Sequence, residues 1–289
     1  MVAERKERFI IVKQTLSYLA VILAAVQILT GTVWILCNFM AGCKSEASAR
    51  YLAAAESGLM DEYIGVLYPF VMKVAQIIAI PFGGAYEQIM YIIQVSAAVA
   101  SCVTFWRLSS VLPEGGKNTG WCYWVPGLML VTIPLCVQWH LTILPNSLAA
   151  SLFMLLLGHV IYSWRTSCYN DKRWVLRTGI LWALLVLLMP DYLWLSLPPM
   201  IFYICGALKY ATVQAKKHGA IGSWYRIIWV LVPVALALSA TGLNHAIQQP
   251  GSGNRIQKSV EAAMVSRFVW PHFGTNYFFW PDEIKEIMT

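Results

Sequence analysis

Long apolar runs alternate with short polar segments along this chain, and the pattern predicts a bundle of membrane-spanning helices. A helix needs about 20 predominantly apolar residues to cross the hydrocarbon core of a bilayer. Seven runs approach that length, so we expect an all-α, polytopic membrane protein with about seven transmembrane helices. The predicted spans are 16–40, 85–106, 121–139, 146–163, 176–189, 193–210 and 227–244.

The first run follows a basic N-terminal segment, an order that also begins a secretory signal peptide. Here the run is too long for the apolar part of a signal peptide, and no clear small-residue cleavage site follows it. We therefore interpret 16–40 as a retained first span.

The segment 41–84 follows the first span and is predicted to hold two helices in an outer loop. Residues from Ser45 to Glu56 favour a helix that stops at Gly58. The stretch 64–82 is apolar but contains Lys73 and Gln76, and it ends at a Gly-Gly pair. We expect an amphipathic helix that lies in the interface or re-enters the outer leaflet.

The outer C-terminal segment, 245–289, is predicted to hold an amphipathic helix at 255–270. A densely aromatic stretch, 270–281, follows it. Such residues anchor a chain at the membrane interface, and they equally suit the lining of a lipid-binding groove. Another short helix is expected to begin at Pro281. We therefore expect the chain to be a truncated product of a longer protein.

Composition agrees with a membrane location and a single integral membrane domain over 1–289. Apolar residues make up 58% of the chain and charged residues 12%, against about 45–50% and about 25% in soluble domains. The net charge of +7 comes from short basic clusters between spans. Such clusters set membrane topology, and no pattern typical of nucleic-acid binding accompanies them.

The distribution of basic residues predicts a cytoplasmic N-terminus and a C-terminus outside. We expect a multi-pass protein of the bacterial plasma membrane. This orientation places 14 of the 21 Lys and Arg residues in the cytoplasm, as the positive-inside rule requires. They are Arg5, Lys6, Arg8, Lys13, Arg107, Lys117, Arg165, Lys172, Arg173, Arg177, Lys209, Lys216, Lys217 and Arg226.

The seven cysteines contain no CxxC pair and mostly fall within or beside the predicted spans. We interpret most of them as small apolar packing residues. Cys37 and Cys43 would share the outer side and be free to form a bridge, although the odd total argues against a disulfide framework.

Two adjacent carboxylates, Asp61 and Glu62, lie between the first and second predicted spans. Charge close to a bilayer is costly, and this favours a functional role. Two structural interpretations stay open beside it: a solvated loop tip, or acids placed at a helix start by the helix dipole.

Three short stretches carry a resemblance to a known family: Tyr51-Leu52-Ala53 with Leu59 to Pro69, His140 to Ala149, and Met189 to Tyr192. Together with the order of a first span, an outer helix and then Asp-Glu, they resemble the GT-C glycosyltransferases. That superfamily includes protein O-mannosyltransferases and bacterial aminoarabinose transferases. Family members usually have more spans, and many have a soluble domain after them.

The resemblance implies transfer of a hexosyl or mannosyl group from a polyprenyl-phosphate donor to a hydroxyl of a glycan, lipid or protein acceptor. A carboxylate would remove the hydroxyl proton, and by its position in the motif Asp61 is the expected base. Glu62 would share that role, orient the acceptor or face water. The implied substrate-binding residues are Arg50, Tyr63, His140, Asn146, Asp191, Tyr192, His245, Arg255, Arg267 and His272.

For several of these residues a structural role stays open. His140 and His245 lie at predicted span ends, where a histidine is often only hydrogen-bonded to its surroundings. Asp191 follows Pro190 in what is equally a plain turn between helices. Arginine suits the phosphate of the donor because its planar fork matches phosphate oxygens.

No metal-binding motif occurs in the sequence. If a hard divalent cation such as Mg²⁺ or Mn²⁺ were bound, Asp61, Glu62 and Asp191 would be its ligands, but their spacing does not show whether they meet. Two other classes of function stay open. One is a secondary transporter or flippase-like protein for a lipid-linked or small solute, and the other is a structural membrane protein.

Overall fold

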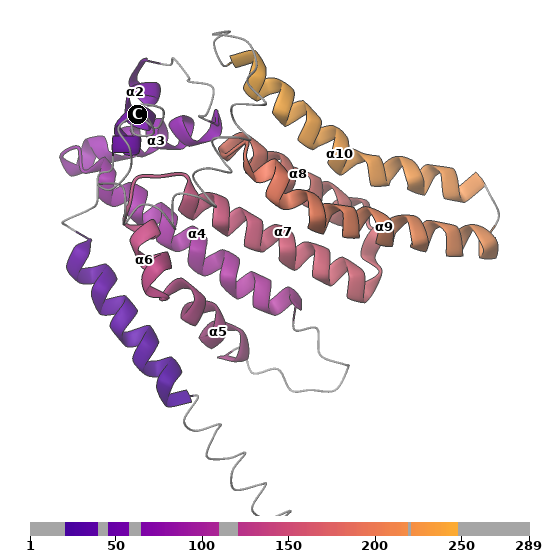
Figure 1. Cartoon of the computed structure of the whole chain (residues 1–289), viewed down its shortest axis with the longest axis horizontal. Helices are drawn as coiled ribbons and strands as arrows, with labels where there is room; N and C mark the ends of the chain where they lie inside the picture. Colours follow the sequence, from indigo (N-terminus) through magenta and orange to yellow (C-terminus); the bar gives the residue numbers. More distant parts are fainter. Residues whose placement is uncertain (1–20, 40–45, 58–64, 110–120, 219–220, 248–289) are drawn as a thin grey trace, which may run out of the picture.

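Each predicted apolar run folds into one or two helices in the computed structural model, which describes residues 21–39, 46–57, 65–109, 121–218 and 221–247 (Figure 1). No β-strand occurs among these residues, and this confirms the predicted all-α class. The helices are an N-terminal helix at Val21–Asn38, α2 at Glu46–Ser57, α3 at Leu67–Ala79, η1 at Ile80–Phe82, α4 at Tyr86–Ser109, α5 at Trp121–Val131, α6 at Pro134–His140, α7 at Asn146–Thr166, η2 at Cys168–Asn170, α8 at Lys172–Leu188, α9 at Tyr192–His218 and α10 at Ile221–Ile247.

Three helices of the described part are long and apolar enough to cross a membrane, against the seven that the sequence predicts. They are the N-terminal helix, α4 and α7. The predicted span 121–139 is instead broken into α5 and α6, of 11 and 7 residues. Proline lacks the N–H that would continue the helix, and Ile133 before Pro134 is extended, with ψ 129°.

The other three predicted spans depart from the expectation for different reasons. α8 has 17 residues and begins with Lys172 and Arg173, which shortens its apolar length. α9 contains the pair Pro198–Pro199. In α10 the described apolar stretch runs only from Leu231 to Ile247.

Small residues let the helices approach closely, as is usual between helices in membranes. An added Cβ at Gly127 of α5 would lie 2.8 Å from the Val103 side chain of α4. One at Gly179 of α8 would lie 2.9 Å from Cα of Pro233 in α10. Glycine is therefore required at both positions by backbone proximity.

Contacts between the helices fix their directions. α4 runs parallel to α7, since Gln94 bonds the turn that precedes α7 and Phe105 packs on Gly158 near the other end. α8 runs parallel to α10 in the same way, and the N-terminal helix runs parallel to α5 and α6. We call the end where α3 begins, α7 begins and α8 ends the α3 end; α2 and α3 lie there (Figure 1).

α3 and η1 form an amphipathic element, as predicted for an interfacial helix. Tyr68, Met72, Ala75 and Ala79 are buried on one side. The opposite side exposes apolar side chains, and Gly83 and Gly84 (φ 72° and 81°) turn the chain back into α4. The exposed apolar residues are Phe70, Val74, Ile77, Ile78, Ile80 and Phe82.

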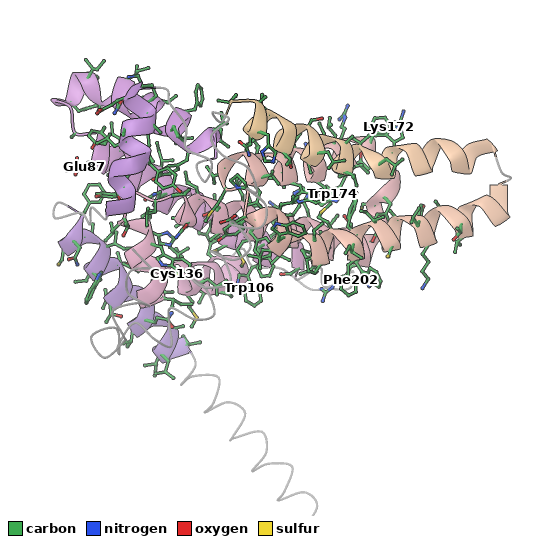
Figure 2. All side chains as sticks on the ribbon, turned by 45° about the horizontal axis from the view of Figure 1, so that its top comes forward. Glu87, Trp106, Cys136, Lys172, Trp174 and Phe202 are labelled. Atoms are coloured by element: carbon green, nitrogen blue, oxygen red, sulfur yellow. The ribbon has the colours of Figure 1, made fainter. Side chains whose placement is uncertain are left out.

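At the opposite end, which we call the basic end, positive side chains gather around a hydrogen-bonded core. Asp171 caps α8 by accepting a bond from the Arg173 N–H at 2.9 Å. Trp174 donates to Ser163 at 2.7 Å and stacks on His159, and Figure 2 shows it between the helices. The exposed basic residues here are Arg107, Arg165, Lys172, Arg173, Arg177 and Lys209, all from the group predicted to share one side of the membrane.

Five cysteines of the described part are free thiols, and of these Cys102 is buried while Cys37 is exposed. The burial of Cys102 fits the predicted role of an apolar packing residue. Cys43, the other half of the bridge considered above, lies outside the described residues.

Candidate functional site

Half of the predicted site residues lie outside the described part of the chain. These are Asp61, Glu62, Tyr63, Arg255, Arg267 and His272. Arg50 lies on α2, but its side chain is also outside the described part. The remaining predicted residues are His140, Asn146, Asp191, Tyr192 and His245, and all of them lie at the α3 end of the bundle.

The chain enters α3 directly against the end of α8. Gly65 lies so close to the carbonyl groups of Leu187 and Leu188 that an added Cβ would overlap them. The next residue, Val66, donates its N–H to Oδ1 of Asn244 at 3.2 Å. The segment that follows Asp61 and Glu62 is thus fixed beside the turn that carries Asp191.

A proline explains why the Val186 carbonyl near the end of α8 lacks its usual donor within the helix. In a continuing helix the carbonyl of Val186 would accept a hydrogen bond from the residue four positions later. That residue is Pro190, which has no N–H. Nδ2 of Asn244 donates to the Val186 carbonyl instead, at 2.9 Å.

Asp191 and Tyr192 occupy the short turn between α8 and α9. The N–H of Tyr192 donates to the Met189 carbonyl at 3.0 Å, and its ring lies edge-on against Phe153 of α7, with centroids 6.1 Å apart. Asp191 is half-buried. Its carboxylate is therefore held at the rim of the bundle and not free in a loop.

Tyr51 of α2 links Asp191 to the core of the α3 end. Burial, and then the nearby Asp191 carboxylate, raise the pKa of the Tyr51 phenol above its usual range. The phenol stays protonated at neutral pH, so its O–H is available as a donor. The Tyr51 ring packs edge-on against Tyr68, with centroids 5.2 Å apart.

A buried glutamine joins α3 and α4 to the turn before α7. Nε2 of Gln94 donates to the Tyr68 hydroxyl at 3.3 Å and to the Leu144 carbonyl at 3.0 Å. Gln94 is fully buried, and its Oε1 has no hydrogen-bond partner among the described residues. A buried acceptor of this kind is normally satisfied by water or by a bound hydroxyl group.

His140 ends α6 and is hydrogen-bonded within the protein. Its Nδ1 lies 2.7 Å from the hydroxyl of Ser147 in α7, and both side chains are buried. Burial lowers the pKa of His140 to about 4, against a smaller opposite effect of the Val131 backbone. The ring is neutral at pH 7, so it offers a hydrogen bond to its surroundings but no positive charge for a phosphate.

The structure brings some of the predicted residues together and leaves others apart. Asp191 and Tyr192 lie beside the start of α3, and Asn146 is half-buried at the start of α7, beside the turn that Gln94 holds. His245 is exposed in the last turn of α10. Within the described residues no three His, Cys, Asp or Glu side chains approach closely enough to hold a metal ion.

Two buried polar residues of the α3 end, Asn244 and Gln94, were not predicted as site residues, although the sequence contains a signal for each. Among the described side chains of α10, the buried ones are Pro233, Ala237, Ala240 and Asn244, a helical stripe whose last member is polar. Gln94 lies in the same way on the buried stripe of α4, with Met90 and Ala98. A polar residue on the buried face of an apolar helix is costly and marks a candidate site.

Acid should destabilise the protein through His140. Below pH 6.5 the unfolded histidine binds a proton that the folded one excludes down to about pH 4, so stability falls by up to about 1.4 kcal/mol per pH unit in that window. Above pH 6.5 the residue makes no such contribution. Thermal unfolding in detergent at pH 7.5 and 5 would measure the loss.

The matched variant is His140→Asn, whose amide keeps a hydrogen-bonding group near Ser147 but does not titrate. It should lose less thermal stability than the wild type on acidification. An equal loss in both proteins would show that His140 is not the group responsible.

Comparisons of this chain with protein-family models, with curated proteins and with solved structures found no match. The function is therefore inferred from the residues of the α3 end and their geometry.

Proposed function

We propose that the protein is a membrane glycosyltransferase that moves a sugar from a polyprenyl-phosphate donor to an acceptor hydroxyl. The observation that carries the proposal is the junction of Gly65 with the end of α8. Gly65 follows Asp61 by four residues, a length of chain that spans at most about 14 Å. The α3 end thus holds both Gly65, where the chain continues from the Asp-Glu segment, and Asp191.

The convergence of three separated stretches supports the same proposal. The stretches that resemble the glycosyltransferases begin at Tyr51, His140 and Met189. Their described parts meet at the α3 end through the Tyr51–Tyr68 contact, the Gln94 bridge to Leu144, and the packing of Gly65 on α8.

In the proposed reaction Asp61 takes the proton of the acceptor hydroxyl as its oxygen attacks the anomeric carbon of the donor. The bond between that carbon and the phosphate oxygen breaks, and the lipid phosphate leaves with the electron pair. A single displacement inverts the anomeric centre. Cationic support for the leaving phosphate is assigned to Arg50, Arg255 and Arg267.

The α3 end also carries groups suited to sugar hydroxyls. The Tyr51 phenol is a donor within the electrostatic influence of the Asp191 carboxylate, and that carboxylate is an acceptor. The apolar side of α3 would lie in the outer leaflet, where the polyprenyl chain of the donor also lies. This arrangement would keep the polyprenyl chain in the bilayer while its phosphate reaches the α3 end of the bundle.

The proposal includes a membrane domain of seven helical passes, with the α3 end outside. The contacts between helices support it because successive long helices alternate in direction. This alternation brings six exposed basic side chains to one end, whereas Lys73 lies on α3 at the other. The passes that are too short or too polar to span alone would be accommodated between the longer ones.

The first test is a mass-spectrometric search for co-purifying polyprenyl phosphate or its sugar conjugates. Wild type should retain a carrier, and Arg50→Ala or Arg267→Ala should lose it if the cation supports the phosphate. Ser239→Ala is a matched control, since its hydroxyl bonds only the Ala235 carbonyl on an exposed side of α10. Intact, monodisperse protein without a carrier in any preparation would favour transport or a structural role.

A further inference from the structure

We infer that Asn244 is a positioning residue for Asp191, a role that rests on the function proposed above. Asn244 is buried in the last full turn of α10, and its amide bonds two segments at once. One segment opens α3, and the other is the end of α8. The two bonds of Asn244 go to backbone atoms, so Asn244 would act on Asp191 through the backbone.

Both groups that Asn244 satisfies are backbone atoms for which no other hydrogen-bond partner is found among the described residues. The N–H of Val66 stands at the start of α3, where no side chain caps the helix. The Val186 carbonyl loses its normal donor because Pro190 has no N–H. A buried backbone group left without a partner is costly, so the single amide holds both segments in place.

Asparagine is the one side chain of this length that donates and accepts at fixed positions. Aspartate would keep the acceptor for Val66 but lose the donor for Val186. Leucine has nearly the same shape and lacks both groups. These two substitutions therefore separate the two bonds.

The rest of the α8–α10 contact does not depend on this amide. Gly179 packs closely on Pro233 eleven residues before Asn244, and Ala237 and Ala240 are buried between the two positions. Loss of the amide should leave that apolar packing intact. Loss of the amide should instead free the last turn of α8. Met189, Pro190 and Asp191 follow that turn directly in the chain.

Hydrogen exchange at the Val66 amide tests the bond itself. In Asn244→Leu this amide should exchange faster than in wild type, whereas in Asn244→Asp it should stay protected. Ser239→Ala, on the exposed side of the same helix, should change nothing. Unchanged protection in Asn244→Leu would overturn the inference, whatever the function of the protein.

Binding of added undecaprenyl-phosphate mannose, a sugar-linked carrier, tests the positioning role when it is followed by native mass spectrometry in detergent, because Asp191 would contact the sugar and not the phosphate. We expect Asn244→Leu and Asn244→Asp to bind roughly tenfold more weakly, the size of losing one good contact. Asp191→Asn should show a similar loss. Because Asn244 acts through Asp191, the double variant Asn244→Leu/Asp191→Asn should bind no more weakly than Asp191→Asn alone.

The outcomes distinguish the two proposals. Additive losses in the double variant would overturn the positioning role while leaving the transferase proposal in place. Wild type that binds no undecaprenyl-phosphate mannose would contradict the proposed function, and the exchange of the Val66 amide would then still decide whether Asn244 holds the junction.

Discussion

Replacing Asp61 with asparagine is expected to abolish sugar transfer while leaving insertion and folding intact. The substitution keeps the shape of the side chain but removes its ability to take a proton. General-base catalysis typically contributes a factor of about 10² to 10⁴. The turnover number of Asp61→Asn should therefore be at least about 10²-fold lower than that of wild type. Transfer would be measured with a radiolabelled polyprenyl-phosphate sugar in purified, detergent-solubilised protein.

Glu62→Gln is the matched control for this experiment, because it makes the same chemical change at the next residue. It should reduce turnover less than Asp61→Asn does. Normal turnover in Asp61→Asn would show that the base has been assigned wrongly. A larger loss in Glu62→Gln would move the base to Glu62.

Helix positions could be predicted from the sequence because their signals are local. Apolar runs placed every long helix, and Gly83 with Gly84 ended the α3 element where predicted. The turn at Met189 and Pro190 separates α8 from α9 as expected. The break between α5 and α6 was missed, although Pro134 is visible in the sequence, because hydropathy alone counts residues and ignores missing N–H groups.

Contacts between helices could not be predicted in the same way. Asn244 bonds Val66, which lies 178 residues away in the sequence, and Val186, which lies 58 residues away. Periodicity shows that Asn244 belongs to a buried stripe, but it does not name the helix that covers the stripe. His245, which is exposed, was therefore predicted as a site residue, and the buried Asn244 beside it was not.

The same reasoning explains why His140 is buried and His245 is exposed, although both were predicted at the outer ends of spans. A histidine at a helix end has the same sequence signal whether it faces solvent or the core. The structure buries His140 against Ser147 and leaves His245 exposed. Only the packing of α6 on α7 distinguishes them, and that packing is decided by the whole bundle.

Gly65→Ala is expected to destabilise the protein and to displace α3 from α8. A Cβ at this position would approach the Leu187 and Leu188 carbonyl groups more closely than real Cβ atoms come to backbone atoms. The obstacle is backbone, so no side-chain rotation relieves it, and overpacking of this kind costs about 1–3 kcal/mol. For a chain of 289 residues that cost corresponds to a fall of roughly 2–5 °C in the unfolding midpoint.

Gly242→Ala is the matched control, since an added Cβ there meets nothing within 4 Å. Alanine favours a helix over glycine by about 1 kcal/mol, so this variant should be as stable as wild type or more so. The fall in Gly65→Ala should be accompanied by weaker retention of the lipid carrier, because the junction that orders the α3 end is disturbed. Equal midpoints for the two variants would mean that the close approach of α3 to α8 is not required, and the main structural support for the proposed site would be lost.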